Sequence, residues 1–163
     1  MIRRLPTAPP APCVWLLDAR PAGLDPSALR DWARELPAPP GARRSSRSYR
    51  HPFALVAFSA GPVGVDLERV EPPEPRFAAS ICTPQERGLG LEHDAAAVAC
   101  LWSGKEALAK ALGDARAYDP RRLGSPLLWP EGRAGPWRAL RLQAPAGHVA
   151  WVCWREPEAG AAD

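Results

Sequence analysis

The stretch "LWSGKEALAKALG", residues 101–113, has the periodicity of an α-helix and guides the interpretation of the rest of the chain. Leu101, Leu108 and Leu112 recur at helical spacing, which predicts that one side packs on a core. Spacings of three and four residues return to the same side of a helix, so the tryptophan and charged residues of this stretch lie near one another. They are Trp102, Lys105, Glu106 and Lys110. This grouping indicates a function beyond packing.

The size and composition of the chain predict one globular domain. It has 163 residues, of which 46% are hydrophobic and 24% charged, enough to bury an apolar core. This composition excludes a disordered or fibrous protein. No apolar run approaches the roughly 20 residues of a membrane span, and "MIRRLPTAPPAP" lacks the apolar region of a secretory signal. We therefore expect a cytoplasmic protein without a membrane segment.

The cysteines, the histidines and the net charge argue against disulfides, a zinc site and a nucleic-acid partner. The four cysteines are widely separated and form no CxxC motif, which favours buried reduced thiols over disulfides or a zinc site. The three histidines have no metal-ligand spacing. The net charge is +3, but basic residues do not gather with aromatic residues in a run, which argues against a nucleic-acid partner. A modestly basic surface suits an acidic partner.

Prolines and glycines divide the first part of the chain into short elements. Residues 13–18, "CVWLLD", are predicted to be a strand. Asp25 is a predicted N-cap, followed by Pro26 and a short amphipathic helix. The basic stretch 37–52 is predicted to be a loop.

Strands and a capped helix follow in the middle of the chain. Residues 53–59 and 63–68 are predicted to be strands, and a tight hairpin is the simplest connection between them. Residues 71–76 are a proline-rich connector. Thr83 and Glu86 have the spacing of a capping box at the start of a helix.

The last part of the chain is predicted to contain a long helix and a hairpin. The helix runs from Asp94 through Leu112, and strands 137–143 and 148–156 alternate apolar with smaller or polar residues. Strands and helices that follow one another in this way predict an α+β fold.

The predicted strand in "GVDLERV", residues 64–70, carries two carboxylates at alternate positions. Alternation sends Asp66 and Glu68 to one face, while Val65 and Leu67 enter the core. Neighbouring carboxylates repel each other unless a cation or a proton intervenes, and their oxygens suit Mg²⁺ that also binds substrate phosphates. A solvated strand end is the alternative, because D-x-E alone is a weak motif.

Taken together, the two segments resemble the signature of the phosphopantetheinyl transferase superfamily, a G-[IV]-D strand followed by [FW]-[SCT]-x-K-E-[SA]-x-x-K on a helix. "GVDLE" matches the first part, and "WSGKEALAK" matches every fixed position of the second. Between them, "ICTPQERG" resembles the family's F-[ST]-x-x-E segment, with Glu86 at the acidic position. The resemblance covers Phe53 to about Arg155. It is closer to the broad-specificity, surfactin-type branch than to the short trimeric synthases.

The resemblance implies a fold as well as a family. The expected architecture is a pseudo-dimer of two small α+β halves, in which antiparallel strands pack on a long helix. Residues 1–163 would form a single domain, with a reduced N-terminal half at 1–52, a motif-bearing half at 53–156 and a tail at 157–163. The short N-terminal half leaves open whether a second chain completes the coenzyme pocket, so a monomer or a weak homo-oligomer is expected.

The resemblance also implies roles for the residues of the two motifs. Asp66, Glu68 and Glu106 would hold Mg²⁺ against the pyrophosphate of coenzyme A. Lys110 would bind a phosphate of coenzyme A. Lys105 would stabilise the transition state or assist the leaving group.

Glu86 is the candidate general base for the carrier-protein serine, directly or through water. The capping box alone also explains a glutamate at this position.

The coenzyme site of this branch usually includes an S-H-S segment, where this chain has Ser48-Tyr49-Arg50. Ser48 and Tyr49 are therefore expected at the coenzyme. Guanidinium groups bind phosphate in a bidentate manner, so the arginines of this stretch are candidates to replace the histidine at a coenzyme phosphate. They are Arg43, Arg44, Arg47 and Arg50, of which Arg44 and Arg47 are the nearest candidates. A solvated basic loop is the alternative.

The predicted function is Mg²⁺-dependent transfer of phosphopantetheine from coenzyme A to a serine of an apo carrier protein. A catalytically weak or inactive family member that binds coenzyme A or a carrier protein is the main alternative. Hydrolysis of a phosphate ester by the same carboxylates is a third reading that nothing in the sequence requires.

Overall fold

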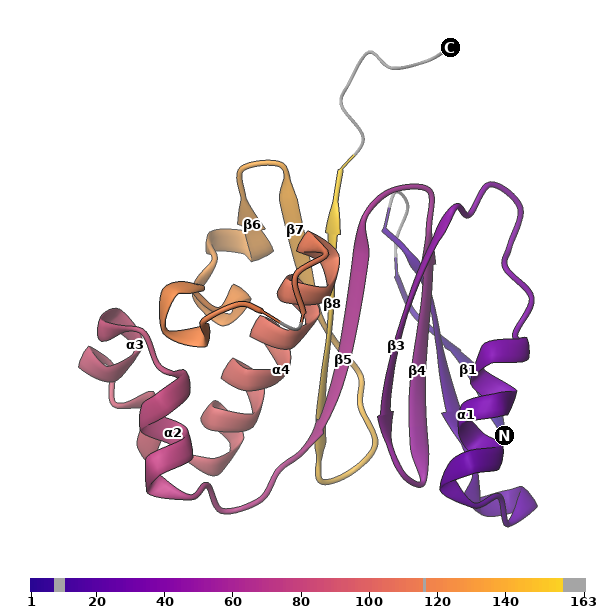
Figure 1. Cartoon of the computed structure of the whole chain (residues 1–163), viewed down its shortest axis with the longest axis horizontal. Helices are drawn as coiled ribbons and strands as arrows, with labels where there is room; N and C mark the ends of the chain where they lie inside the picture. Colours follow the sequence, from indigo (N-terminus) through magenta and orange to yellow (C-terminus); the bar gives the residue numbers. More distant parts are fainter. Residues whose placement is uncertain (8–10, 116, 157–163) are drawn as a thin grey trace.

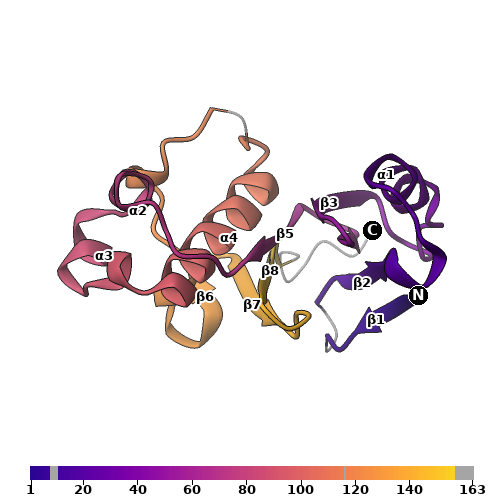
Figure 2. The ribbon, with the colours of Figure 1, turned by 90° about the horizontal axis from the view of Figure 1, so that it is seen from below.

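The computed structural model describes residues 1–7, 11–115 and 117–156, so the predicted tail at 157–163 lies outside the described residues. Two four-stranded antiparallel sheets form the centre of the molecule, with strand orders β1-β2-β4-β3 and β5-β8-β7-β6 (Figure 1). Viewed from below, α1 lies beside the first sheet, and α2, α3 and α4 lie on the side of the second sheet (Figure 2). The α+β prediction is confirmed in this form.

The first sheet contains the N-terminal strands and carries one helix. Its strands are β1 (Ile2–Leu5), β2 (Cys13–Asp18), β3 (Arg44–Arg50) and β4 (Phe53–Ser59). Helix α1 (Pro26–Glu35) begins as predicted, because the Asp25 side chain accepts hydrogen bonds from the first free backbone amides. Leu29 and Ala33 of α1 are buried in a cluster with residues of β2 and β4.

The prediction of a loop at 37–52 is wrong for its second half, where β3 pairs with β4. Two small residues at alternate positions of β3, Ser46 and Ser48, are buried. The arginines of β3 mask this alternation in the sequence. Pairing with β4 satisfies the backbone of a segment whose intrinsic strand propensity is low.

The second sheet contains the motif strand and carries the long helix. Its strands are β5 (Val63–Arg69), β6 (Arg133–Ala134), β7 (Trp137–Leu142) and β8 (His148–Arg155), and β7 and β8 form the predicted hairpin. Helix α4 (Ala95–Leu112) begins after Asp94, whose side chain accepts from the amide of Ala97. Gly113 ends the helix in a left-handed conformation that favours glycine.

The hairpin predicted between residues 53–59 and 63–68 is not formed. β4 pairs with β2 and β3, whereas β5 pairs with β8, so the turn between them carries the chain from one sheet to the other. Both strands are almost entirely buried, and a buried strand has no polar face that would identify its neighbours. Their side chains still meet in one core, which includes Leu55 of β4 and Leu67 of β5.

Short helices surround the α4 side of the second sheet. Helices α2 (Pro75–Ile81) and α3 (Pro84–Gly88) precede α4, and the predicted capping box of Thr83 and Glu86 is present. Single 3₁₀ turns complete the chain at Arg20–Ala22, Leu91–His93, Pro120–Arg122, Pro126–Leu128 and Pro130–Gly132.

Two further findings concern expectations from composition. The four cysteines are free thiols, and three of them are buried. Among the described residues, no helix combines the length and apolar character needed to cross a membrane.

Candidate active site

The edges of the two sheets meet through serine hydroxyls of β3 and backbone amides of β5. Ser46 Oγ accepts from the amide of Val65 at 3.1 Å, and Ser48 Oγ accepts from the amide of Leu67 at 3.2 Å. Ser48 also donates to Asp66 Oδ1 at 2.9 Å. The two strands therefore lie side by side without a backbone ladder, and Asp66 is held at their junction.

Close contact between β5 and α4 brings the helix side chains to the same place. A Cβ atom on Gly64 would lie 1.9 Å from the Ala107 carbonyl oxygen, so only glycine allows this approach. Lys110 of α4 donates to Asp66 Oδ1 at 2.7 Å and to the Val65 carbonyl at 3.1 Å. Asp66 and Lys110, which the sequence placed in separate motifs, thus form an ion pair.

Glu68 is bound by an arginine from β3. Arg50 donates to both carboxylate oxygens of Glu68, each at 2.6 Å. Burial raises the pKa of Glu68, and the hydrogen bonds from Arg50 oppose this shift. Arg50 belongs to the basic stretch of the sequence, but its distance from Glu68 along the chain conceals the pairing.

Glu106 is bound by Tyr118, a residue that the sequence analysis did not single out. The Tyr118 hydroxyl donates to Glu106 Oε1 at 2.5 Å. Burial and the neighbouring Glu106 charge raise the pKa of Tyr118 far above its ordinary value, so the hydroxyl remains a donor. Nothing in the sequence marks this tyrosine, because it follows α4 in an irregular connection outside the motifs.

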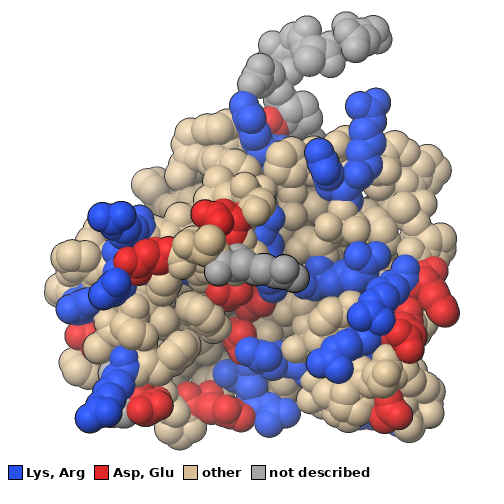
Figure 3. Space-filling model, viewed as in Figure 1, with Lys and Arg blue, Asp and Glu red and all other residues tan. Residues whose placement is uncertain are grey.

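The three predicted metal ligands, Asp66, Glu68 and Glu106, surround one region of the molecule, which we call the acidic region. The hydrogen bond to Glu68 raises the pKa of Arg50, and the charges of Glu68, Asp66 and Glu106 add to this shift. In the view of Figure 3, acidic side chains lie near the centre of the molecule with Lys and Arg side chains beside them. However, within residues 1–7, 11–115 and 117–156, no three Asp, Glu, His or Cys side chains converge closely enough to hold a metal ion.

One carboxylate oxygen in this region still fits a cation. Asp66 Oδ2 is buried and has no hydrogen-bond partner among the described residues, whereas Oδ1 is bound by Ser48 and Lys110. A buried carboxylate oxygen without a partner is costly, and a hard cation such as Mg²⁺ would satisfy it. The donor set near Asp66 is therefore compatible with Mg²⁺.

The predicted catalytic pair, Glu86 and Lys105, lies in the protein interior. Lys105 Nζ donates to Glu86 Oε2 at 2.7 Å, and neither side chain is exposed. Lys105 also donates to the carbonyls of Ile81 and Pro120, while Glu86 accepts from the amide of Ser125. Burial lowers the pKa of Lys105, and the hydrogen bond to Glu86 opposes this shift. The catalytic roles stay predictions; the contacts join α2, α3, α4 and the connection after α4.

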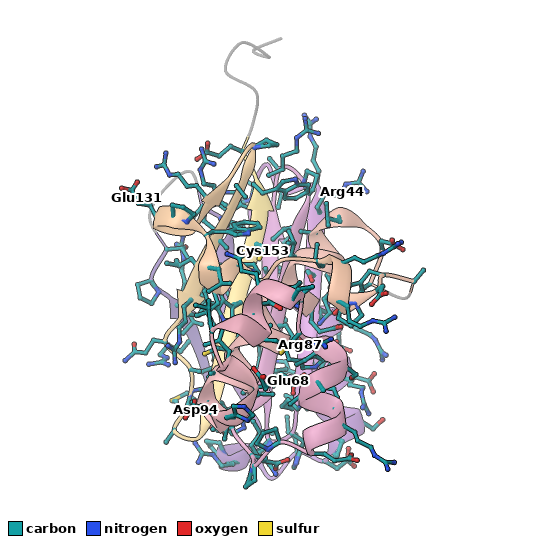
Figure 4. All side chains as sticks on the ribbon, turned by 90° about the vertical axis from the view of Figure 1, so that its left-hand side faces the viewer. Arg44, Glu68, Arg87, Asp94, Glu131 and Cys153 are labelled. Atoms are coloured by element: carbon teal, nitrogen blue, oxygen red, sulfur yellow. The ribbon has the colours of Figure 1, made fainter. Side chains whose placement is uncertain are left out.

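Strand alternation divides the residues predicted at the coenzyme into two groups. Arg44 and Ser48 face the second sheet, and Arg44 lines a cavity of about 370 Å³ together with Lys110. Arg47 instead donates to the Ala33 carbonyl at the end of α1, and Tyr49 packs on the α1 side of the first sheet. Figure 4 shows that Arg44 and Glu68 lie well apart along the length of the sheets.

A second cavity, of about 400 Å³, adjoins the Arg50–Glu68 pair. Its far wall includes Phe77 of α2 and Trp102 of α4, whose ring centroids are 5.3 Å apart in an edge contact. The acidic region thus has one cavity toward Lys110 and another toward Trp102.

Comparison with known proteins assigns this combination of strand, helix and charged residues to a class of transferases. Residues 62–144 match the family described as the 4'-phosphopantetheinyl transferase superfamily, and the chain belongs to this superfamily. Membership implies transfer of phosphopantetheine to carrier proteins, with coenzyme A as the substrate and Mg²⁺ as the usual metal. No curated protein matches the chain.

Proposed function

We propose that this protein transfers phosphopantetheine from coenzyme A to a serine of an apo acyl or peptidyl carrier protein and releases adenosine 3',5'-bisphosphate. The observation that carries the proposal is the buried Asp66 of the strand motif, whose Oδ1 is bound by Lys110 of the helix motif and whose Oδ2 has no partner in the described part of the chain. We place the chain near the surfactin-type branch, because two sheets, each with its own helix, fit a pseudo-dimer within one chain.

Mg²⁺ would be held by carboxylates of the acidic region, among which Asp66 offers an oxygen that no described residue binds. When bound, the ion would neutralise the pyrophosphate of coenzyme A as the phosphorus–oxygen bond to the leaving group breaks. Glu106 lies on the helix face that also carries Lys110, so the Tyr118 hydrogen bond would hold its carboxylate toward the same region.

Lys110 would bind the phosphates of coenzyme A on the side of the cavity that it shares with Arg44. Its ammonium group is 2.7 Å from Asp66 Oδ1 and its side chain is 23% exposed, so it can contact both the acidic region and a ligand. Positive charge at this point would stabilise the charge that develops on the leaving group.

In this proposal Lys105 and Glu86 hold neighbouring segments in place and do not take part in the chemical step. Their buried ion pair supports the connection that begins with Tyr118 and continues to Ser125. Proton transfer from the serine would need an exposed acceptor, which neither side chain provides in the observed conformation.

The proposal is tested by incubating the protein with coenzyme A, Mg²⁺ and a panel of apo carrier proteins, and measuring intact mass. The expected product is a carrier heavier by one phosphopantetheine group, and the Asp66→Asn variant or removal of Mg²⁺ with a chelator should abolish it. Unmodified carriers throughout the panel, with a folded enzyme, would contradict the proposal.

A non-catalytic binding module is the second candidate. One observation favours it: each of the three carboxylates accepts a hydrogen bond from a side chain of this protein. Lys110 donates to Asp66, Arg50 to Glu68 and Tyr118 to Glu106. Such a module would bind coenzyme A in calorimetry without transferring its phosphopantetheine group in the mass assay.

A further inference from the structure

We infer that Arg50 keeps Glu68 from coordinating the metal, so that Asp66 and Glu106 are the carboxylates that hold Mg²⁺. This inference rests on the proposed function, because it concerns the metal of that reaction. It departs from the expectation that all three carboxylates are ligands.

The first argument is the way β3 lies along β5. The amides of Val65 and Leu67 donate to hydroxyls two residues apart on β3, so both strands advance in the same direction along their junction. Ser48 reaches Asp66, and two residues further along both strands Arg50 reaches Glu68. Because side chains alternate with a period of two, both contacts follow from one strand register. The Arg50–Glu68 pair is thus built into the junction.

The second argument is the difference between the three carboxylates. Arg50 forms a fork with Glu68 in which Nε donates to Oε2 and the terminal nitrogen donates to Oε1. A fork of this kind is among the stronger ion-pair geometries, and it occupies both oxygens of Glu68, whereas Lys110 binds only Oδ1 of Asp66. The Glu68 side chain is 12% exposed, which limits its movement toward another partner.

Asp66 and Glu106 retain oxygens for a metal. Asp66 Oδ2 has no partner within residues 1–7, 11–115 and 117–156, and Glu106 accepts through Oε1 from a neutral hydroxyl that brings no positive charge. Mg²⁺ in phosphate-transfer sites is usually bound by one or two carboxylates together with substrate phosphates and water. Two carboxylates are therefore sufficient, and Glu68 is free to join the two sheets.

The competing arrangement has Arg50 move to a phosphate when coenzyme A binds, which would release Glu68 to the metal. The two arrangements differ in the effect of removing Arg50 and Glu68 together. The double variant Arg50→Gln, Glu68→Gln removes one charge of each sign, so the net charge near the metal is unchanged.

Binding of Mn²⁺, a paramagnetic substitute for Mg²⁺, is measured by electron paramagnetic resonance with and without coenzyme A. Under our inference the double variant keeps its Mn²⁺ affinity within about threefold of wild type, while Asp66→Asn and Glu106→Gln each lose about tenfold or more. As a matched control, Arg69→Gln with Glu71→Gln removes an exposed ion pair from the same cavity and should also leave Mn²⁺ affinity unchanged.

A loss of tenfold or more in the double variant, with the control unaffected, would overturn the inference. Circular dichroism establishes whether the variant is folded. If it is not, carbon-13 NMR of the carboxyl groups in wild type decides, since Mg²⁺ should shift the Asp66 and Glu106 signals but leave the Glu68 signal in place. A shifted Glu68 signal would overturn the inference as well.

Failure of the inference and failure of the proposed function are distinguishable. The metal measurements do not depend on turnover, so a Glu68 response in a protein that modifies carriers contradicts only the inference. Carriers that stay unmodified while Mn²⁺ binds as described contradict only the function. A wild-type protein that binds no Mn²⁺ in either condition contradicts the inference and the metal requirement of the function together.

Discussion

Lys105 Nζ lies 2.7 Å from Glu86 Oε2, and neither side chain has any exposed surface. Backbone carbonyls accept from Lys105, and backbone amides of Thr83 and Ser125 donate to Glu86. A fully hydrogen-bonded pair of this kind joins four segments in the interior next to the acidic region. The K-E pair of the helix motif therefore points in two directions, with Lys105 toward the interior and Glu106 toward the acidic region.

We predict that Lys105→Met destabilises the fold by about 3–5 kcal/mol, because it leaves the Glu86 charge buried without its partner. Urea unfolding at equilibrium measures the loss. Adding Glu86→Gln to the same protein should recover part of it, since the uncompensated charge is then removed. A Lys105→Met protein of normal stability that has lost transfer activity would instead support the catalytic role predicted from the motif.

We predict that Gly64→Ala destabilises the protein by about 3 kcal/mol or more, or prevents folding, because the added methyl group would meet the backbone of α4. Thermal unfolding measures the effect. Gly124→Ala is the control: no atom of the described residues lies within 4 Å of its added carbon, and we expect a change of about 0.5 kcal/mol or less. Equal effects at both positions would contradict the close packing of β5 on α4.

We predict that Tyr118→Phe weakens Mn²⁺ binding by about tenfold, because Glu106 loses the hydrogen bond that orients its carboxylate. The chain has two tyrosines, and Tyr49→Phe on the α1 side of the first sheet should leave metal binding unchanged. If Tyr118→Phe binds Mn²⁺ as wild type does, Tyr118 does not position a metal ligand.

We predict that Arg44→Ala weakens coenzyme A binding by about tenfold, because a charge-assisted hydrogen bond to phosphate contributes about 1.5–3 kcal/mol. Arg47→Ala should have little effect, since that guanidinium donates to the end of α1. Titration calorimetry with coenzyme A and dephospho-coenzyme A separates the phosphates. If wild type binds both ligands equally, Arg44 does not contact the ribose phosphate.

Local features of the fold were predictable from the sequence. Asp25 caps α1, Thr83 and Glu86 form the capping box, and the β7–β8 hairpin is present, because each depends on residues close together in the chain. The prediction of a β4–β5 hairpin was wrong, because strand pairing depends on residues far apart in the chain. Both strands are apolar along most of their length, and an apolar pattern predicts burial without identifying the neighbouring strand.

In the candidate site, too, the motif residues were predictable from the sequence, but their hydrogen-bond partners were not. Motif spacing singled out Asp66, Glu68, Glu106 and Lys110, and helical periodicity placed the last two on one side of α4. The donors that bind the carboxylates were not predictable as partners. Arg50 and Tyr118 reach Glu68 and Glu106 only because β3 lies along β5 and the connection after α4 folds back over the helix.

The sequence by itself determined the α+β class, the superfamily motifs and the local capping of the helices, since periodicity and short-range hydrogen bonding act within a few residues. Only the tertiary structure decided which carboxylates keep an oxygen available. That outcome depends on long-range contacts, in which Gly64 lets α4 approach β5, Ser48 joins Asp66 at the strand junction and Arg50 takes both oxygens of Glu68. Such contacts arise from the packing of whole sheets and helices, which no local pattern in the chain encodes.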